Sequence, residues 1–278
     1  KVLDYKFIPK LNKVKLDNEC VLSLQKNLNY TIISKLKLNI KKLIPKLDHD
    51  WMEVSKIDII KKDTSIKKHF NKVWLKNKSP WNFYEPTNLI IVEKNRKLLL
   101  PIVNKSNSIL DVGCAGGDFL NFVLNSIEKK IHVIGVDIAE QAIKKAKLLN
   151  IYDELYVSNI DNIYDFVTSK IDLIVLSEVL YYQKNYIQTL DKLITISNKY
   201  FFLSLAVGDH FLKKNYIYNI IKFFDNNKFE LINELIFDYK KFKIPMRYWK
   251  YFTNKKISQT HKQILIFKKN NENFKVKS

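Results

Sequence analysis

The feature that most constrains the fold is a regular alternation of two kinds of segment beyond about residue 106. Short apolar runs rich in β-branched and aromatic residues alternate with stretches whose apolar residues recur at helical spacing. The runs are "SILDV", "HVIGVDI", "ELYVSN", "DLIVLS", "YFFLSLAV", "FELINELIFDY" and "HKQILIFKK". Runs apolar on both faces and separated by helices indicate an α/β architecture with a mostly parallel sheet. The last connection is not clearly helical, so we expect the final strand to be antiparallel.

The 278-residue chain is long enough for one large domain with an appendage. We expect four parts: a Lys-rich N-terminal helical extension whose fold the sequence does not specify at 1–66, a helical lid segment at 67–105, the α/β domain at 106–270, and a tail at 271–278. In the lid segment, proline positions predict a helix before Pro80, a turn through Pro86 and a second helix up to Pro101.

The formal charge of +20 raises the question of a nucleic-acid partner. Only Arg96 and Arg247 among the 48 basic residues are arginine, whereas phosphate and base recognition favours the arginine fork. We therefore interpret most of this charge as compositional, which leaves an acidic substrate or RNA as open alternatives.

The sequence does not indicate a membrane-inserted or secreted protein. No apolar stretch approaches the ~20 residues of a membrane span, and the first residues lack the apolar core of a signal peptide. Cys20 and Cys114 provide neither a disulfide framework nor metal-ligand spacing, and the five histidines show no such spacing either. The sequence therefore predicts a cytoplasmic protein without a metal site.

The stretch "ILDVGCAGGDF" places a turn of small residues directly after the first run. In an open parallel sheet, ligands bind beyond the carboxyl ends of the strands. Gly113, Ala115, Gly116 and Gly117 let the main chain turn tightly and approach a ligand closely. Asp111, at the end of the run, can accept a hydrogen bond from a ligand ammonium group or from loop amides.

The second run, in "VIGVDIA", carries Asp137 near its end. A carboxylate there can accept hydrogen bonds from both ribose hydroxyls of a nucleoside. The alternative is an N-cap for the helix predicted in "AEQAIKKAK". The dinucleotide fingerprint, counted from Gly113, needs glycine where the chain has Ala115 and Asp118. NAD is therefore a poor match.

Four motifs in order, "ILDVGCAGGDF", "VIGVDIA", "YVSNID" and "DLIVLSEVLYY", resemble the class I S-adenosylmethionine-dependent methyltransferases over about residues 108–270. The resemblance implies a Rossmann-like sheet of seven strands, mostly parallel with the last strand antiparallel, and helices on both faces. It also implies S-adenosylmethionine as cofactor. "DLIVLSEVLYY", with "SPWNFYE" upstream, is similar to the nodulation-protein-S-like group and to bacterial methyltransferases that act on sugars or amino sugars.

The same resemblance assigns roles to individual residues. It implies that the glycine turn lies along the methionine part of the cofactor, that Asp137 holds the ribose, and that Ile138 covers one adenine face. Asn159 stands where the family often has an acid that binds the adenine amine, and its carbonyl can still accept. The residues implied to bind the cofactor are Trp81, Tyr84, Asp111, Gly113, Cys114, Ala115, Asp137, Ile138, Asn159, Ile160, Leu176 and Ser177.

Ala115 replaces the commoner glycine, which is tolerable if its φ angle is negative. Trp81 and Tyr84 belong to "SPWNFYE", which is either an apolar plug or a lid that closes over the cofactor and excludes water.

Methyl transfer requires an oriented acceptor and, for oxygen or nitrogen acceptors, often a base. Glu178, Tyr181 and Tyr182 follow the fourth run, where the tyrosines either line an acceptor pocket or pack under a loop. Glu178 either anchors an acceptor amine or caps the next turn. His210, oriented by Asp209 after the fifth run, is our preferred base. The catalytic candidates are therefore His210, Asp209, Glu178 and Tyr181.

These observations predict a methyltransferase that acts on an O or N atom of a small polar acceptor, such as a sugar, amino sugar or glycan precursor. Methylation of RNA, with the basic N-terminal region as a clamp, is the second hypothesis. The third is a non-catalytic relative that binds cofactor or a partner.

Overall fold

The computed structural model describes residues 63–76, 80, 86–183, 185–208, 214–238 and 259–270. All of them lie in one unit of the chain, Asp48–Ser278. Most of the predicted N-terminal extension and all of the predicted tail lie outside the described residues. Within the described ranges, no helix combines the length and apolar character that a bilayer crossing requires.

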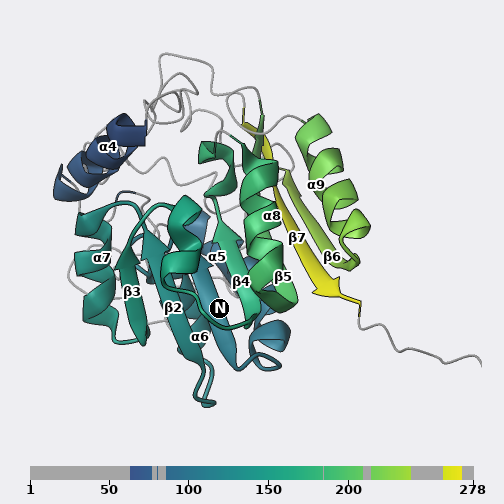
Figure 1. Ribbon diagram of the computed structural model, residues 1–278, viewed down its shortest axis with the longest axis horizontal. Helices are drawn as coiled ribbons and strands as arrows, with labels where there is room; N and C mark the ends of the chain where they lie inside the picture. The colour runs from purple at the N-terminus through teal and green to yellow at the C-terminus, as the bar shows by residue number, and fades with distance from the viewer. Residues whose placement is uncertain are drawn as a thin grey trace, which may run out of the picture. The chain divides into compact units, whose positions relative to one another are not determined.

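A seven-stranded sheet forms the centre of the described structure (Figure 1). Its strands are β1 (Ser108–Val112), β2 (His132–Asp137), β3 (Glu154–Val157), β4 (Ile171–Ser177), β5 (Ser197–Gly208), β6 (Phe229–Asp238) and β7 (Gln259–Lys269). Their order is β3-β2-β1-β4-β5-β7-β6. Pairs among β1 to β5 are parallel, whereas β7 is antiparallel to both β5 and β6. The predicted mostly parallel sheet with an antiparallel last strand is confirmed.

Helices precede and connect the strands. They are α4 (Asp63–Lys76), α5 (Pro86–Val103), α6 (Asp118–Leu124), α7 (Glu140–Ala146), α8 (Tyr186–Ile196) and α9 (Lys214–Asn226), with 3₁₀ turns η4 (Lys147–Leu149), η5 (Ile160–Asp165) and η6 (Leu180–Tyr182). The predicted end of α5 at Pro101 is corrected, because the helix continues to Val103. Pro101 lacks the N–H that would bond the carbonyl of Lys97, but Asn104 still donates to the carbonyl of Leu100 at 3.0 Å, so helical bonding resumes beyond the proline.

The sheet is covered on both faces by apolar helices, as expected for an α/β fold. One cluster joins Leu99 of α5 to Ile109 of β1 and includes buried residues of α6. The other joins Leu190 of α8 and Ile220 of α9 to Leu110 of β1. Because neighbouring residues of a strand point to opposite faces, Ile109 and Leu110 belong to different clusters. The two cores hold the carboxyl ends of the strands in fixed positions.

Helix α4 packs across that carboxyl edge. Phe70, Val73 and Trp74 of α4 form a third buried cluster with Ala139 and Ala142 at the start of α7. Three partly buried side chains from the strand ends pack against this cluster: Ala115, Ile138 and Tyr182. These are residues in or beside the predicted cofactor site, so α4 closes one side of it.

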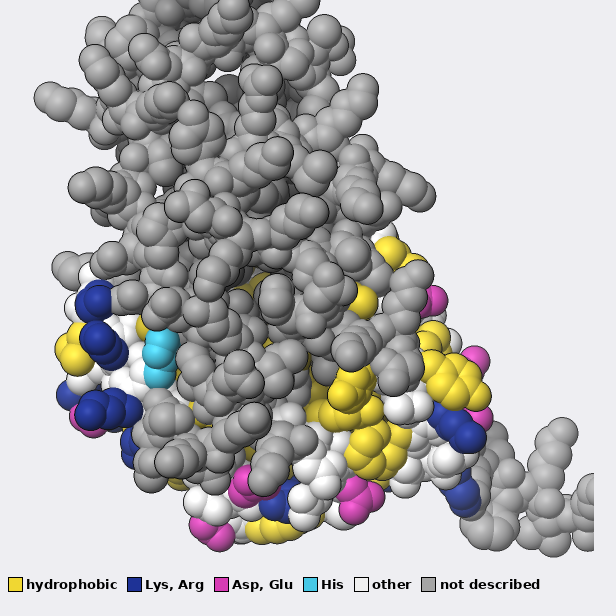
Figure 2. Space-filling model, turned by 90° about the horizontal axis from the view of Figure 1, so that it is seen from above, with side chains coloured by type: hydrophobic (Ala, Val, Ile, Leu, Met, Phe, Trp, Pro, Cys, Tyr) yellow, Lys and Arg dark blue, Asp and Glu magenta, His cyan; other side chains and the backbone are white. Residues whose placement is uncertain are grey.

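The outward face of α4 is basic. Lys68, Lys72 and Lys76 recur every four residues and are exposed, and Lys67 lies beside them. Figure 2 shows Lys and Arg side chains at the left end of the upper face, where Figure 1 places α4. The same helix therefore presents an apolar side to the strand ends and a row of cations to the outside.

Candidate active site

The turn after β1 adopts backbone conformations that few residue types accept. Gly113 has a φ angle of +69° and Gly117 one of +79°. Ala115 has a φ angle of +52°, so the negative angle at which alanine would replace glycine without strain is not present. For a residue with a Cβ atom this left-handed conformation costs about 1–2 kcal/mol. The main-chain N–H groups of Gly113 and Cys114 both donate to the carbonyl of Val136, at 2.8 and 3.0 Å. The turn is therefore strained and tied to β2.

Gly113 also lets the segment after β4 approach the turn. A Cβ atom built on Gly113 would lie 2.6 Å from Cγ2 of Val179, well inside van der Waals contact. Any side chain at this position would push the turn and the β4–η6 connection apart. The absence of a side chain at 113 therefore leaves room for Val179 beside the turn.

Asp137 connects the end of β2 to the turn. One carboxylate oxygen accepts from the main-chain N–H of Ala115 at 2.9 Å, and the other from that of Ala139 at 2.8 Å. The N-cap of α7 is Ala139 rather than Asp137. Burial raises the pKa of Asp137 to about 6, while the main-chain N–H groups around it oppose this rise. Because a carboxylate can accept about four hydrogen bonds, capacity remains for ribose hydroxyls.

Asp111 lies buried beneath the turn, with 3% of its surface exposed. The hydroxyl of Tyr152 donates to its carboxylate at 2.7 Å. Burial raises the pKa of Asp111 to about 7, the Tyr152 hydroxyl lowers it, and the nearby Asp137 carboxylate raises it further. The thiol of Cys114 is also buried, and burial raises its pKa well above the ordinary value. Cys114 can therefore meet a ligand in the turn only through its main chain.

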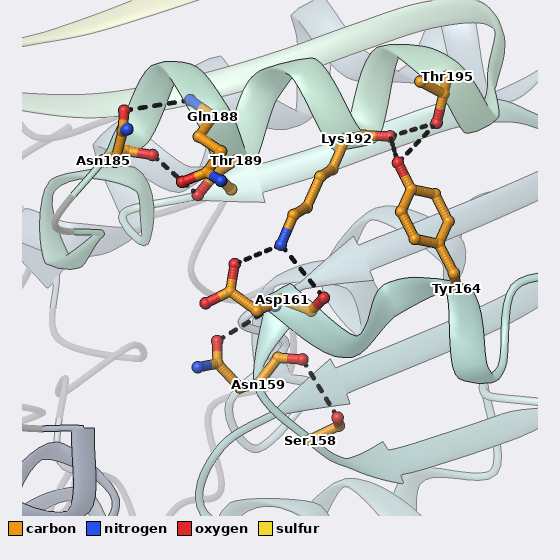
Figure 3. A network of polar contacts seen from close by, with 9 residues as sticks. All are labelled: Ser158, Asn159, Asp161, Tyr164, Asn185, Gln188, Thr189, Lys192 and Thr195. Carbon is orange, nitrogen blue, oxygen red and sulfur yellow. Dashed lines mark hydrogen bonds and ion pairs between the residues drawn. The ribbon is translucent and has the colours of Figure 1, made fainter.

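The segment after β3 is held by a network of polar contacts shown in Figure 3. The side-chain oxygen of Asn159 accepts from the main-chain N–H of Asp161 at 3.3 Å and caps η5. Lys192 reaches from α8 to the Asp161 carboxylate at 2.8 Å. Tyr164 of η5 lies 3.0 Å from the Thr195 hydroxyl. The position expected for the adenine amine is thus fixed from two elements.

Two predicted cofactor residues direct their side chains into the core. Ile160 and Leu176 have 5% and 1% of their surface exposed and belong to the cluster under α8. A cofactor would therefore meet mainly their main-chain atoms, near the end of β4 for Leu176 and at the start of η5 for Ile160. Ile138, by contrast, is partly buried beside the turn, and Ser177 ends β4 opposite Ser204 of β5.

Glu178, directly after β4, is the centre of a polar cluster. Its φ angle of +59° is a second left-handed conformation at the same edge. Its side chain accepts from the Ser204 hydroxyl at 2.8 Å and lies 3.0 Å from the ammonium group of Lys262 on β7. The Tyr181 hydroxyl donates to its other oxygen at 3.3 Å. Strained residues held by several partners are frequent at functional sites.

The two tyrosines after Glu178 form a continuous aromatic surface with α4. The rings of Tyr181 and Tyr182 lie 4.5 Å apart, and the ring of Tyr182 meets that of Phe70 edge-to-face at 5.3 Å. Burial raises the pKa of Tyr182 to about 12 and that of Tyr181 well above its usual range. Both phenols are therefore neutral hydrogen-bond donors near neutral pH.

Four predicted site residues lie outside the described residues: Trp81, Tyr84, Asp209 and His210. Conversely, Tyr152, Ser204 and Lys262 contact predicted site residues but carry no motif that marks them in the sequence. In the described part of the chain, no three His, Cys, Asp or Glu side chains are grouped so as to hold a metal ion.

The described site fits an adenosyl cofactor. A tight turn built mainly of glycines, a carboxylate with spare acceptor capacity, and the apolar flank of Ile138 meet at one edge of the sheet. These are the groups that a charged amino-acid end, a ribose diol and an adenine ring require.

Comparisons with solved structures agree with the fold. Magnesium protoporphyrin IX methyltransferase from Synechocystis PCC 6803, with bound S-adenosylmethionine, is 13% identical, with a TM-score of 0.52 and coverage of 82% of this chain and 100% of that chain. The N-methyltransferase NodS from Bradyrhizobium japonicum WM9, with S-adenosylhomocysteine, is 13% identical, with a TM-score of 0.51 and coverage of 81% and 100%. At this identity the likeness shows the fold.

No curated protein matches the sequence. Residues 86–243, more than half of the chain, match the family described as "Methyltransferase domain". The match covers the glycine turn, Asp137 and Glu178. The chain therefore belongs to the methyltransferase-domain family and is an enzyme whose cofactor is S-adenosylmethionine.

Proposed function

We propose that the enzyme transfers the methyl group of S-adenosylmethionine to an O or N atom of a small polar acceptor, such as a sugar, amino sugar or glycan precursor. The sulfonium cofactor supplies an already activated methyl group. The protein must therefore bind the cofactor, orient the acceptor and exclude water. The nodulation-protein-S-like group is the narrower family to which we assign it, on the strength of "DLIVLSEVLYY". We expect it to act in the cytoplasm.

The observation that carries this proposal is the polar cluster around Glu178. This carboxylate belongs to a residue in a strained conformation and has hydroxyl and ammonium partners from three elements. Such strain costs free energy and is concentrated at functional sites, which supports a role in binding the acceptor. Its oxygen facing Tyr181 has one described donor, at 3.3 Å, so it has capacity for a hydroxyl or amine of the acceptor. The adjacent tyrosine rings suit the C–H faces of a sugar.

The other roles are assigned by sequence. The cofactor residues are those at the ends of β1 to β4, with Trp81 and Tyr84 as cover. His210 is the proposed base and Asp209 its orienting acid, because both directly follow Gly208, the last residue of β5. The lid segment at 67–105 includes most of α4, whose packing on Ala115, Ile138 and Tyr182 supports a covering role.

The test has two stages. A thermal shift with S-adenosylhomocysteine checks cofactor binding, and absence of a shift with ligand in large excess would contradict a methyltransferase. Transfer of a labelled methyl group to a panel of sugars and amino sugars then checks the acceptor class. Glu178→Gln should lower transfer by about 10–100-fold through a lost charge-assisted bond while cofactor affinity is kept. Glu140→Gln, an exposed residue of α7, is the matched control.

A second candidate is methylation of RNA, which the exposed row of lysines on α4 favours. Phosphate contacts release counterions, so affinity for RNA should fall steeply as salt concentration rises. A flat salt response, or transfer to sugars but not to RNA, would remove this candidate.

A further inference from the structure

Tyr152 reaches the glycine turn from a distant part of the chain. It follows η4 and precedes β3, and its hydroxyl bonds to the carboxylate of Asp111, 41 residues away in sequence. Tyr152 is itself partly buried, and its ring packs with the core cluster under α5 and α6. The bond of 2.7 Å is short, as expected when a hydroxyl donates to a carboxylate.

Two glycines make room for the Tyr152 ring. A Cβ atom on Gly117 would lie 2.9 Å from Cε2 of Tyr152, and one on Gly135 would lie 2.8 Å from its Cδ1 and Cε1. Gly117 needs glycine for its positive φ angle as well, but Gly135 has no such angle. Crowding by the Tyr152 ring, together with Leu155, accounts for the absence of a side chain at Gly135. Gly117 in the turn and Gly135 in β2 therefore leave the space that lets the Tyr152 side chain reach Asp111.

We propose that Tyr152 is a positioning residue for cofactor binding, which holds Asp111 as an oriented carboxylate that accepts a hydrogen bond from the ammonium group of the cofactor's methionine part. The proposal rests on the proposed function, because it requires the cofactor to lie along the glycine turn. No loop amide occupies the Asp111 carboxylate among the described hydrogen bonds, since the amides of Gly113 and Cys114 bond to Val136.

The hydrogen bond from the Tyr152 hydroxyl favours the charged form of Asp111. Asp111 has a pKa raised to about 7 by burial, and the Asp137 carboxylate adds to this rise. The other described ionisable groups near the pair are the Cys114 thiol in the turn and Asp118 of α6. Asp118 is itself paired with Lys145 of α7 at 2.5 Å. The Tyr152 hydroxyl, by donating to the carboxylate, lowers the pKa of Asp111. Without it, Asp111 would be mostly neutral at pH 7 and would lose its attraction for an ammonium group.

The experiment is calorimetric titration with S-adenosylhomocysteine between pH 5.5 and pH 8.5 for wild type and Tyr152→Phe. Affinity of the wild type should rise with pH and level off near pH 7, because the carboxylate form binds the cation. In Tyr152→Phe the affinity should stop rising at a pH about one to two units higher than in the wild type. Its affinity at pH 7 should be about tenfold lower. Tyr218→Phe, which removes an exposed hydroxyl of α9, should leave the profile unchanged.

Two further comparisons separate positioning from mere support of the fold. In an Asp111→Asn background, Tyr152→Phe should have no additional effect on affinity. An identical pH profile for wild type and Tyr152→Phe would overturn the inference. So would a loss of affinity that is equal at every pH and persists in the Asp111→Asn background. Failure of the wild type to bind S-adenosylhomocysteine at any pH would instead contradict the proposed function on which the inference depends.

Discussion

The carboxylate of Asp137 lies 2.9 Å from the main-chain nitrogen of Ala115, so the end of β2 holds the strained residue of the turn after β1. One side chain thus supports the turn and, in our proposal, also binds the ribose. The hydrogen bond from the main-chain N–H of Ala115 to this carboxylate helps to hold Ala115 in its left-handed conformation.

Asp137→Ala should therefore weaken binding of S-adenosylhomocysteine by about 1–3 kcal/mol, through lost charge-assisted bonds and a looser turn. Asp137→Asn keeps one acceptor oxygen and should lose less. Calorimetric titration at pH 8, above the pKa of about 6, measures both changes. Asp191→Asn, an exposed residue of α8, serves as control. Unchanged affinity in Asp137→Ala would exclude the ribose role.

The positive φ angle of Ala115 predicts that Ala115→Gly stabilises the protein. Removal of Cβ relieves about 1–2 kcal/mol of strain, and the greater freedom of glycine in the unfolded chain offsets part of this gain. We expect a net rise of about 0.5–1 kcal/mol in the free energy of unfolding, measured in urea. Ala142→Gly, within α7, should instead lower it by about 1 kcal/mol or more. Equal losses in both variants would show that Ala115 carries no strain.

The Glu178–Lys262 pair predicts a measurable energetic coupling. Lys262 and Glu178 side chains are 16% and 27% exposed, so the pair is more shielded from water than a surface pair. Lys262→Met and Glu178→Gln should each lower the free energy of unfolding by about 1–3 kcal/mol, and the double variant by less than their sum. The exposed Glu140–Lys144 pair, subjected to the same cycle, should show no measurable coupling. Strict additivity at 178 and 262 would contradict the pairing.

Burial of Asp111 predicts a dependence of stability on pH. Its pKa of about 7 in the folded protein exceeds the value of about 3.9 in an unfolded chain. The folded state therefore binds more protons between these values, and its stability falls as pH rises through that window. Asp111→Asn removes this loss. It should be about 2–4 kcal/mol more stable than wild type at pH 8 and no more stable at pH 4, by urea unfolding. A difference that is the same at both values would exclude titration of Asp111.

Most of the fold could be predicted because it depends on patterns that recur within short segments. Each of the seven apolar runs is a strand, and the predicted direction of the last strand is confirmed. The turn beginning at Gly113 and the acid at 137 lie at the carboxyl edge because parallel strands share that edge. The ends of helices are predicted less accurately, because α5 continues past Pro101 to Val103.

The partners of the site residues could not be predicted, because they come from distant parts of the chain. Lys262 is one lysine among many, and only the pairing of β7 with β5 brings it to Glu178. Tyr152 is one of 15 tyrosines, and its role depends on space left by Gly117 and Gly135. The backbone angle of Ala115 likewise follows from its bond to Asp137 rather than from its own identity.

The placement of β7 between β5 and β6 has a consequence for biosynthesis. In the described sheet β6 joins through β7, so β6 cannot dock until the ribosome has released the chain as far as about Lys269. The nascent polypeptide can assemble β1 to β5 earlier, since domains build from the N-terminal side during translation. Lys262 arrives with the last strand, so the Glu178 cluster is completed only after β1 to β5 and the glycine turn have been synthesised.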